Sequence, residues 1–202
     1  EHDPDEIWAN TRQVVAAALA RADARAADVV AVGITNQRET TVVWERSTGK
    51  PVHPAIVWQD TRTQRICDRL AAVDGVDRFR RTTGLPLATY FAGPKAAWIL
   101  DEVDGAGAAA GRGDLLFGTM DTYLLWQVTG GPDGGVHVTD ATNASRTMLM
   151  DLRTLDWDEE ICAEMGVPMP MLPAIHSSAE IYGHARESGL LGGVPVSGIL
   201  GD

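Results

Sequence analysis

The chain has 202 residues, enough for one large domain with a substantial core. Its 17 basic and 28 acidic residues give a formal net charge of −11, which opposes non-specific attraction to nucleic acid or to anionic lipid. Its apolar runs fall far short of a membrane span and no basic-then-apolar leader opens it, so we expect a soluble protein without a nucleic-acid or membrane partner.

Cysteines and histidines are few and scattered. Cys67 and Cys162 lie far apart within helix-like segments, a usage typical of reduced cytosolic thiols, and this favours a cytoplasmic protein. The 5 histidines show no metal-ligand spacing with each other or with cysteine. We therefore predict no zinc or other metal site held by the protein itself.

The first predicted elements are a helix and a strand. Asp3 is a helix cap followed by Pro4 at the first helical position, and apolar residues recur at helical spacing to about Ala24. The nearly continuous apolar run from Val29 to Ile34 is typical of a strand buried on both faces of an α/β sheet.

A dense polar segment follows at the carboxyl end of that strand, where α/β sheets bind their ligands. Arg38 offers only hydrogen-bond donors and Glu39 only acceptors, so together they match a polyol, whose hydroxyls both donate and accept. The alternative is a surface ion pair, which adjacent opposite charges usually form. Spacing alone leaves both interpretations open.

Two further strands are predicted at residues 41–45 and 55–58. Trp58 ends the second, where its ring could pack against the CH groups of a small polyol. It could equally be a core tryptophan at the edge of the sheet. Helical patterns follow at residues 61–72, 76–81 and 96–103, and Tyr90 lies in the loop before the last of these, where its hydroxyl can donate to and accept from a ligand.

The remainder of the chain is predicted to hold strands at 115–117 and 194–200 and helices at 119–128 and 155–165. The polar block at 139–147 either supports a site or forms a local capping network. Asp202 directly follows the last strand, the place of a general base facing the same crevice, although an aspartate after a strand is more often a helix cap.

Several of these segments, taken in chain order, resemble the signature stretches of the glycerol kinases, which belong to the FGGY family of carbohydrate kinases. The matching segments are residues 33–41, 55–62, 116–122, 139–147 and 197–202. Residues 90–101 are similar to the first FGGY signature, but Ala92 stands where the family usually has a small hydroxyl residue, and Pro94 is a second departure. Ordered matches across the chain are more specific than any single motif.

This resemblance implies an α/β fold of the ribonuclease H-like, actin-type ATPase class, with a mixed sheet flanked by helices. Residues 1–202 would be most of the N-terminal, polyol-binding domain, incomplete at both ends, and the nucleotide-binding C-terminal domain would be absent. On that expectation the isolated fragment is inactive.

The resemblance also implies a reaction, the ATP-dependent phosphorylation of glycerol to sn-glycerol 3-phosphate. Arg38, Glu39, Trp58, Tyr90 and Asp202 would hold glycerol, and Asp202 would be the general base. The cofactors would be ATP, contacted mostly outside this chain, and Mg²⁺, arriving with the nucleotide. Full-length relatives would form a homo-oligomer, a dimer or a tetramer.

Two alternatives remain open. The protein could be an FGGY kinase for another polyol or a ketose, or the isolated fragment could be a non-catalytic polyol-binding domain. Family members inhibited by fructose 1,6-bisphosphate carry an arginine in the glycine-rich loop before the last strand. Residues 189–194 contain none, so we expect weak or absent inhibition there.

Overall fold

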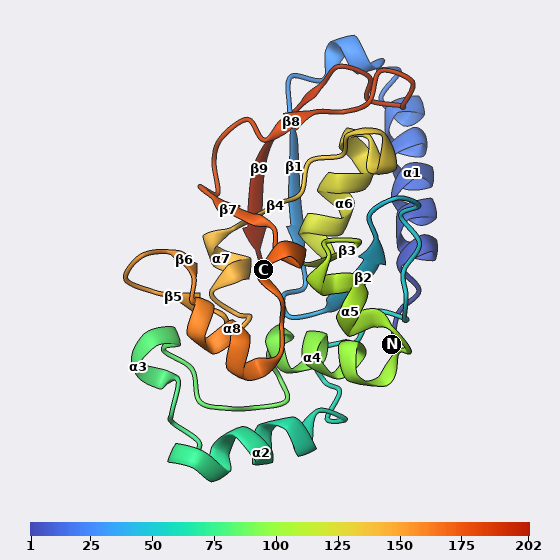
Figure 1. Cartoon of the computed structure of the whole chain (residues 1–202). Coiled ribbons are helices and arrows are strands. Elements are labelled where there is room, and N and C mark those ends of the chain that lie inside the picture. Colours follow the sequence, from blue (N-terminus) through green and yellow to red (C-terminus); the bar gives the residue numbers. More distant parts are fainter.

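A computed structural model describes residues 1–202 as a mixed α/β structure. Figure 1 shows β1 and β9 side by side with α6 beside them, while α2, α3, α4 and α8 gather at the opposite end of the molecule. The helices are α1 Pro4–Arg21, α2 Gln64–Asp74, α3 Arg80–Thr83, α4 Ala92–Glu102, α5 Ala106–Gly111, α6 Met120–Thr129, α7 Ala141–Ala144 and α8 Glu159–Met165. The strands are β1 Val32–Asn36, β2 Thr41–Glu45, β3 Leu115–Thr119, β4 Val138–Asp140, β5 Met150–Asp151, β6 Asp156–Trp157, β7 Ala174–His176, β8 Gly183–His184 and β9 Pro195–Gly201.

The sheet that positions the candidate site is mixed, with strand order β1-β9-β8. β1 and β9 run parallel, and β8 pairs with β9 in the antiparallel direction. Asn36 lies opposite Gly201 in the register, so the carboxyl ends of β1 and β9 are level. The residues that follow these two strands therefore emerge at the same edge of the sheet.

The strand predicted at 29–34 is displaced and less buried than expected. β1 spans Val32–Asn36. Its first four residues alternate between partly buried and exposed, Asn36 is buried, and Val30 lies outside the strand with 89% exposure. The prediction of burial on both faces was wrong, because the face that carries Gly33 and Thr35 is exposed.

Other predicted elements also differ, and the helix predicted at 76–81 is displaced to α3, Arg80–Thr83. Residues 55–58 form no strand, since Ala55 and Ile56 make only isolated bridges, to His2 and Thr41. The helix predicted at 155–165 begins at Glu159, because the side chain of Asp158 accepts a hydrogen bond from the Ile161 N–H and caps the helix there. The Asp158 cap is a local signal that apolar spacing overlooked, whereas the pairing of residues 55 and 56 depends on distant parts of the chain.

The start of α1 is confirmed. Asp3 accepts hydrogen bonds from the backbone of Asp5 and Glu6, and Pro4 is the first helical residue, although the helix ends at Arg21. Helix α4 instead starts four residues earlier than predicted, at Ala92. Its first two N–H groups donate to the carbonyls of residues 146 and 147 at 3.4 and 2.7 Å, so backbone groups replace the missing capping hydroxyl.

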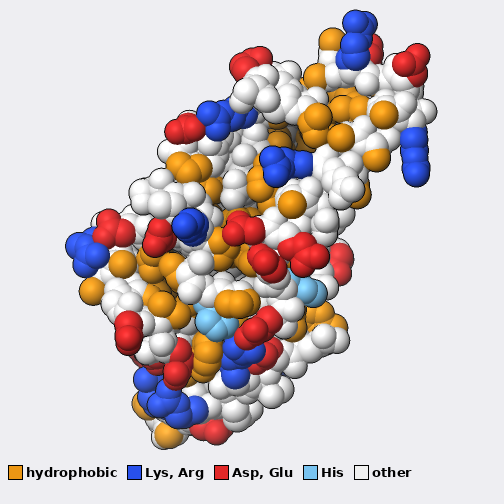
Figure 2. Space-filling model, turned by 90° about the vertical axis from the view of Figure 1, so that its right-hand side faces the viewer, with side chains coloured by type: hydrophobic (Ala, Val, Ile, Leu, Met, Phe, Trp, Pro, Cys, Tyr) orange, Lys and Arg blue, Asp and Glu red, His pale blue; other side chains and the backbone are white.

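The main core lies between the β2–β3 pair and helices α4, α5 and α8. Val43, Ile99 and Phe117 are almost fully buried in it, and a second cluster surrounds Trp44 and Tyr123 on α6. Figure 2, which shows the molecule from the side, has charged side chains of both signs with apolar surface between them. None of the helices combines the length and apolar character needed to cross a membrane.

Candidate active site

Arg38 and Asp202 meet where β1 and β9 end. The Asp202 carboxylate accepts from the Arg38 Nε at 3.3 Å and from its backbone N–H at 3.4 Å. The Asp202 N–H in turn donates to the Asn36 carbonyl at 3.1 Å, which continues the parallel ladder by one residue. Both side chains face solvent, with exposures of 35% for Arg38 and 64% for Asp202.

The Arg38 side chain lies directly against Gly201, so a larger residue there would displace it. A Cβ on Gly201 would fall 2.4 Å from the Arg38 Cδ and 2.6 Å from its Cγ, closer than such atoms can approach.

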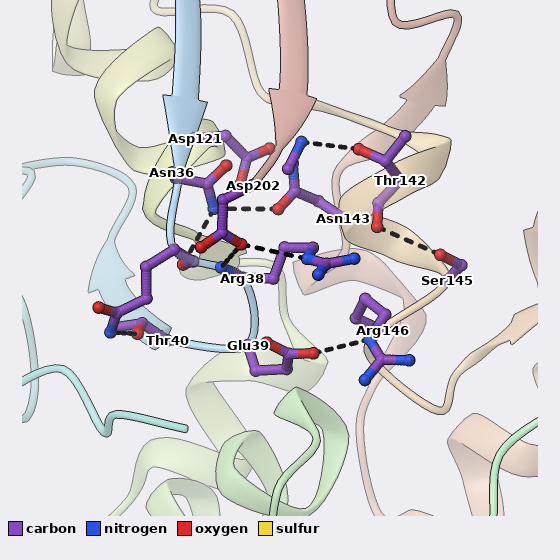
Figure 3. A network of polar contacts seen from close by, with 12 residues as sticks. Asn36, Arg38, Glu39, Thr40, Asp121, Thr142, Asn143, Ser145, Arg146 and Asp202 are labelled. Carbon is purple, nitrogen blue, oxygen red and sulfur yellow. Dashed lines mark hydrogen bonds and ion pairs between the residues drawn. The ribbon is translucent and has the colours of Figure 1, made fainter. Parts of the chain in front are cut away.

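Glu39 points in the other direction, into the protein. It is 3% exposed, and its Oε1 accepts from the Arg146 Nε at 2.7 Å. Its backbone has φ of 65°, a left-handed conformation that costs a side-chain-bearing residue roughly 1–3 kcal/mol. That conformation sends Arg38 and Glu39 to different sides of the same turn, as Figure 3 shows.

Aromatic rings lie beside this buried carboxylate. The Arg146 guanidinium lies 5.6 Å from the centre of the Tyr90 ring and 5.0 Å from that of Phe91. The rings of Tyr90 and Trp58 are 5.5 Å apart and tilted by 58°. Trp58 is 37% exposed, so it is not the core tryptophan of the alternative interpretation.

Lys95 holds the segment that carries Tyr90. Its side chain is fully buried, and its ammonium donates to the carbonyls of Thr89 at 2.8 Å, of Phe91 at 3.1 Å and of Tyr90. Burial lowers the pKa of Lys95 to about 8, an effect that the charge of Glu39 partly opposes. The ammonium therefore stays charged at neutral pH.

A buried polar network lies beneath the ends of β1 and β9. The Asn36 Nδ2 donates to the Asn143 Oδ1 at 2.9 Å and to the Asp121 Oδ1 at 3.4 Å. Asp121 has no exposed surface, and burial raises its pKa to about 6 although the hydroxyls of Thr119 and Thr139 donate to it.

The five predicted site residues thus belong to two groups of contacting side chains. The two groups are neighbours because Arg38 and Glu39 are adjacent residues of one turn. Arg38 lies with Asp202, whereas Glu39 is linked through Arg146 to Tyr90 and then to Trp58. Their roles toward a ligand stay predictions. A separate hollow of about 620 Å³, lined by α1, β1, α6 and residues 185–191, contains none of these five side chains.

Sequence reasoning did not single out two side chains that organise the site. Arg146 was placed only within a general polar block, although a buried acid such as Glu39 needs a cationic partner. Lys95 was noted only as part of a motif, yet a lysine among the apolar residues that begin a helix indicates an ammonium that needs hydrogen-bond acceptors when buried.

No three His, Cys, Asp or Glu side chains of the chain are grouped as a metal site. Mg²⁺ commonly takes one or two carboxylates and fills its remaining positions with water and phosphate oxygens. The chain offers no carboxylate cluster that would form a complete cage for such an ion, which is consistent with an ion held mainly by nucleotide phosphates.

Comparison with known proteins gives a consistent result. Residues 1–202 match the family described as FGGY family of carbohydrate kinases, N-terminal domain. A curated protein named glycerol kinase from Saccharopolyspora erythraea is 68% identical over 202 residues, and one from Beutenbergia cavernae is 65% identical. Each match covers 100% of this chain and 40% of the relative, so the chain spans about 40% of the length of these relatives.

Solved structures share the fold. A glycerol kinase from Plasmodium falciparum with ADP superposes with a TM-score of 0.91 at 32% identity, covering 100% of this chain and 40% of that protein. A xylulose kinase from Rhodospirillum rubrum superposes with a TM-score of 0.84 at 22% identity, covering 99% of this chain and 40% of that protein. At this identity the likeness shows the fold alone. With the mixed β1-β9-β8 sheet, these likenesses confirm the ribonuclease H-like, actin-type α/β class.

Proposed function

The chain belongs to the FGGY family of carbohydrate kinases, and we propose that the protein containing it transfers the γ-phosphoryl group of ATP to glycerol, giving sn-glycerol 3-phosphate. The observation that carries this proposal is the meeting of Arg38 and Asp202 at the level ends of two parallel strands, beside the buried Glu39. The names of the relatives at 65% identity and above support glycerol as the acceptor.

Glycerol would bind between the two contacting groups. Arg146 uses the Glu39 Oε1, which leaves Oε2 to accept from a hydroxyl, while the Arg38 guanidinium donates to another. The faces of Trp58 and Tyr90 would pack against the carbon chain, because aromatic rings contact CH groups while neighbours bind the hydroxyls.

The chemical step would use Asp202 as general base. Its carboxylate takes the proton of the terminal hydroxyl, the hydroxyl oxygen forms a bond to the γ-phosphorus, and the bond from that phosphorus to the β–γ bridging oxygen breaks to release ADP. Arg38, which contacts the same carboxylate, would orient it toward the hydroxyl. Bound Mg²⁺, arriving with the nucleotide, would supply charge neutralisation on the phosphate oxygens.

Other parts of the proposal concern the whole protein. Residues 1–202 would be the polyol-binding half of the kinase, with the nucleotide-binding domain elsewhere in the protein, which the 40% coverage of the relatives supports. We also propose a cytoplasmic homo-oligomer. The two buried cysteines, both free thiols, support a reducing compartment.

The test is product formation by the intact protein with Mg-ATP and either glycerol, erythritol or xylulose. Glycerol should give the highest kcat/KM, and Asp202→Asn should lower kcat by about 10²–10⁴-fold. Asp77→Asn is the matched control, because Asp77 is an equally exposed carboxylate paired with an arginine at 3.0 Å, away from the site. Preference for the ketose, or full activity of Asp202→Asn, would contradict the proposal.

A further inference from the structure

One short segment, residues 140–146, contacts both groups of the candidate site. It consists of Asp140, helix α7 and the two residues that follow the helix. Figure 3 shows it reaching toward the ends of β1 and β9 on one side and toward Glu39 on the other. None of its side chains was predicted to contact the ligand.

Asp140 anchors the segment. It has no exposed surface, and its carboxylate accepts from the backbone N–H groups of Thr142 and Asn143, both at 3.1 Å. It also accepts from the side chains of Thr142 at 2.7 Å, Asn143 at 2.9 Å and Ser178 at 2.6 Å. These five donors fix the orientations of the Thr142 hydroxyl and the Asn143 amide.

The Thr142 hydroxyl and the Asn143 amide then each bond to the end of one strand, β9 and β1 respectively. The Thr142 hydroxyl, whose proton points to Asp140, accepts from the Gly201 N–H at 2.8 Å, one residue before Asp202. The Asn143 Oδ1 accepts from the Asn36 Nδ2, and the Asn36 carbonyl accepts from the Asp202 N–H. The backbone on which Asp202 sits is therefore held from both sides by one segment.

Arg146, the last residue of the segment, contacts the group that contains Glu39. Arg146 donates to the Glu39 Oε1 and lies over the rings of Tyr90 and Phe91. Glu39 is almost fully buried, and Arg146 is its ion-pair partner, so the bond of Arg146 to Oε1 leaves Oε2 for a ligand.

We propose that residues 140–146 position the two groups separately, with Thr142 setting the place of Asp202 and Arg146 setting the place of Glu39. This inference rests on the proposed function, because it assigns Asp202 to the reaction and Glu39 to polyol binding. Thr142 and Arg146 are positioning residues, since each acts through another side chain or strand end.

The proposal predicts that two variants of one segment change different kinetic constants. A base used only in the transition state affects kcat, whereas an interaction made equally in the ground and transition states affects KM. Losing one well-placed hydrogen bond costs about 1.4 kcal/mol, or roughly tenfold. Thr142→Val should therefore lower kcat about tenfold with KM for glycerol within about twofold, and Arg146→Gln should raise that KM about tenfold with kcat within about twofold.

The experiment is steady-state kinetics of the intact protein, with glycerol affinity measured in parallel by calorimetry. Thr142→Ser keeps a hydroxyl that both donates and accepts, so it should restore the wild-type kcat. Ser145→Ala is the control, because its hydroxyl bonds only to the Thr142 carbonyl within the segment, at 3.2 Å. If Thr142→Val does not fold, Thr142→Ala removes the same acceptor without a new methyl group and carries the same expectation.

The two ways to fail are distinct. If the wild-type protein phosphorylates no glycerol, the proposed function is wrong. If the wild-type protein is active and both variants change the same constant by a similar factor, or Thr142→Val matches the wild type, residues 140–146 do not position the groups separately and the inference alone is overturned. In calorimetry, weaker glycerol binding by Arg146→Gln together with unchanged binding by Thr142→Val supports the inference independently of the kinetic constants.

Discussion

The two halves of the candidate site are built differently. In the exposed half, Arg38 and Asp202, the ion pair is 3.3 Å long and both side chains face solvent. In the buried half, the group of Glu39, Arg146, Tyr90 and Trp58, the charged side chains have close partners. Glu39 is 3% exposed, and Lys95, which holds the Tyr90 segment, is 0% exposed. The buried half is organised before a ligand arrives, whereas the exposed half keeps its carboxylate accessible.

This difference has a physical meaning for a kinase. Polar groups that recognise hydroxyls gain affinity when their positions are fixed in advance, because less conformational entropy is lost on binding. A general base must instead reach a proton and a moving phosphoryl group, so its carboxylate has to remain free of strong internal partners. Three predictions follow for stability, beginning with the largest expected effect.

Lys95→Met should strongly destabilise the buried half. It replaces the ammonium with an apolar group and leaves the carbonyls of Thr89, Tyr90 and Phe91 without a donor, which should lower the free energy of unfolding by about 3 kcal/mol. Urea denaturation of the intact protein measures this. Lys50→Met is the control because Lys50, the other lysine of the chain, is exposed, and its substitution should change stability by less than about 0.5 kcal/mol.

Equal stability of the two lysine variants would mean that the carbonyls find other donors, and the buried half would then not be preorganised by Lys95. Glycerol affinity gives a second readout. We expect Lys95→Met to weaken it, because the backbone that carries Tyr90 is no longer held at Lys95.

Asp121, buried beneath the exposed half, should make the protein less stable as pH rises. Its folded-state pKa is about 6, above the ordinary value of 3.8, so between these values the folded state binds more protons than the unfolded state. The stabilisation from the protonated form is complete below the unfolded pKa and is lost as pH rises through the folded pKa. From about pH 4.5 to pH 7 the loss should be roughly 2 kcal/mol.

The measurement compares urea denaturation of the wild type and Asp121→Asn at both pH values. Asparagine does not titrate, so the variant should lack this part of the pH dependence, and the difference between the two proteins isolates it from other groups. A variant whose stability changes with pH exactly as the wild type does would show that Asp121 does not titrate in this window.

Local signals in the sequence predicted much of the fold. The Asp3-Pro4 helix start, β2 at Thr41–Glu45 and the last strand all appear where capping, β-branched residues and turns indicate them. Residues 55–58 have the same apolar pattern but form no strand, because pairing depends on a partner elsewhere in the chain. Leu155 has φ of 57°, a backbone conformation that helical spacing cannot reveal.

The candidate site shows the same division. The meeting of Arg38 with Asp202, 164 residues apart, could be anticipated because both follow strands whose carboxyl ends share an edge. The pairing of Arg146 with Glu39, 107 residues apart, could not be anticipated from the sequence. It depends on where α7 packs and on the left-handed backbone at Glu39. Sequence rules therefore anticipated the residues that follow strands better than the side chains that hold them.

The smallest expected effect comes from the ion pairs themselves, compared by two double-mutant cycles on the free energy of unfolding. The Arg38–Asp202 pair is exposed, so its coupling energy should be below about 0.5 kcal/mol and should fall further in high salt. The Arg146–Glu39 pair joins a 27% exposed side chain to a 3% exposed one at 2.7 Å, and its coupling should be about 1.5 kcal/mol with little salt dependence. Similar coupling energies in the two cycles would remove the contrast between the halves, because the exposed pair would then be as firmly organised as the buried one.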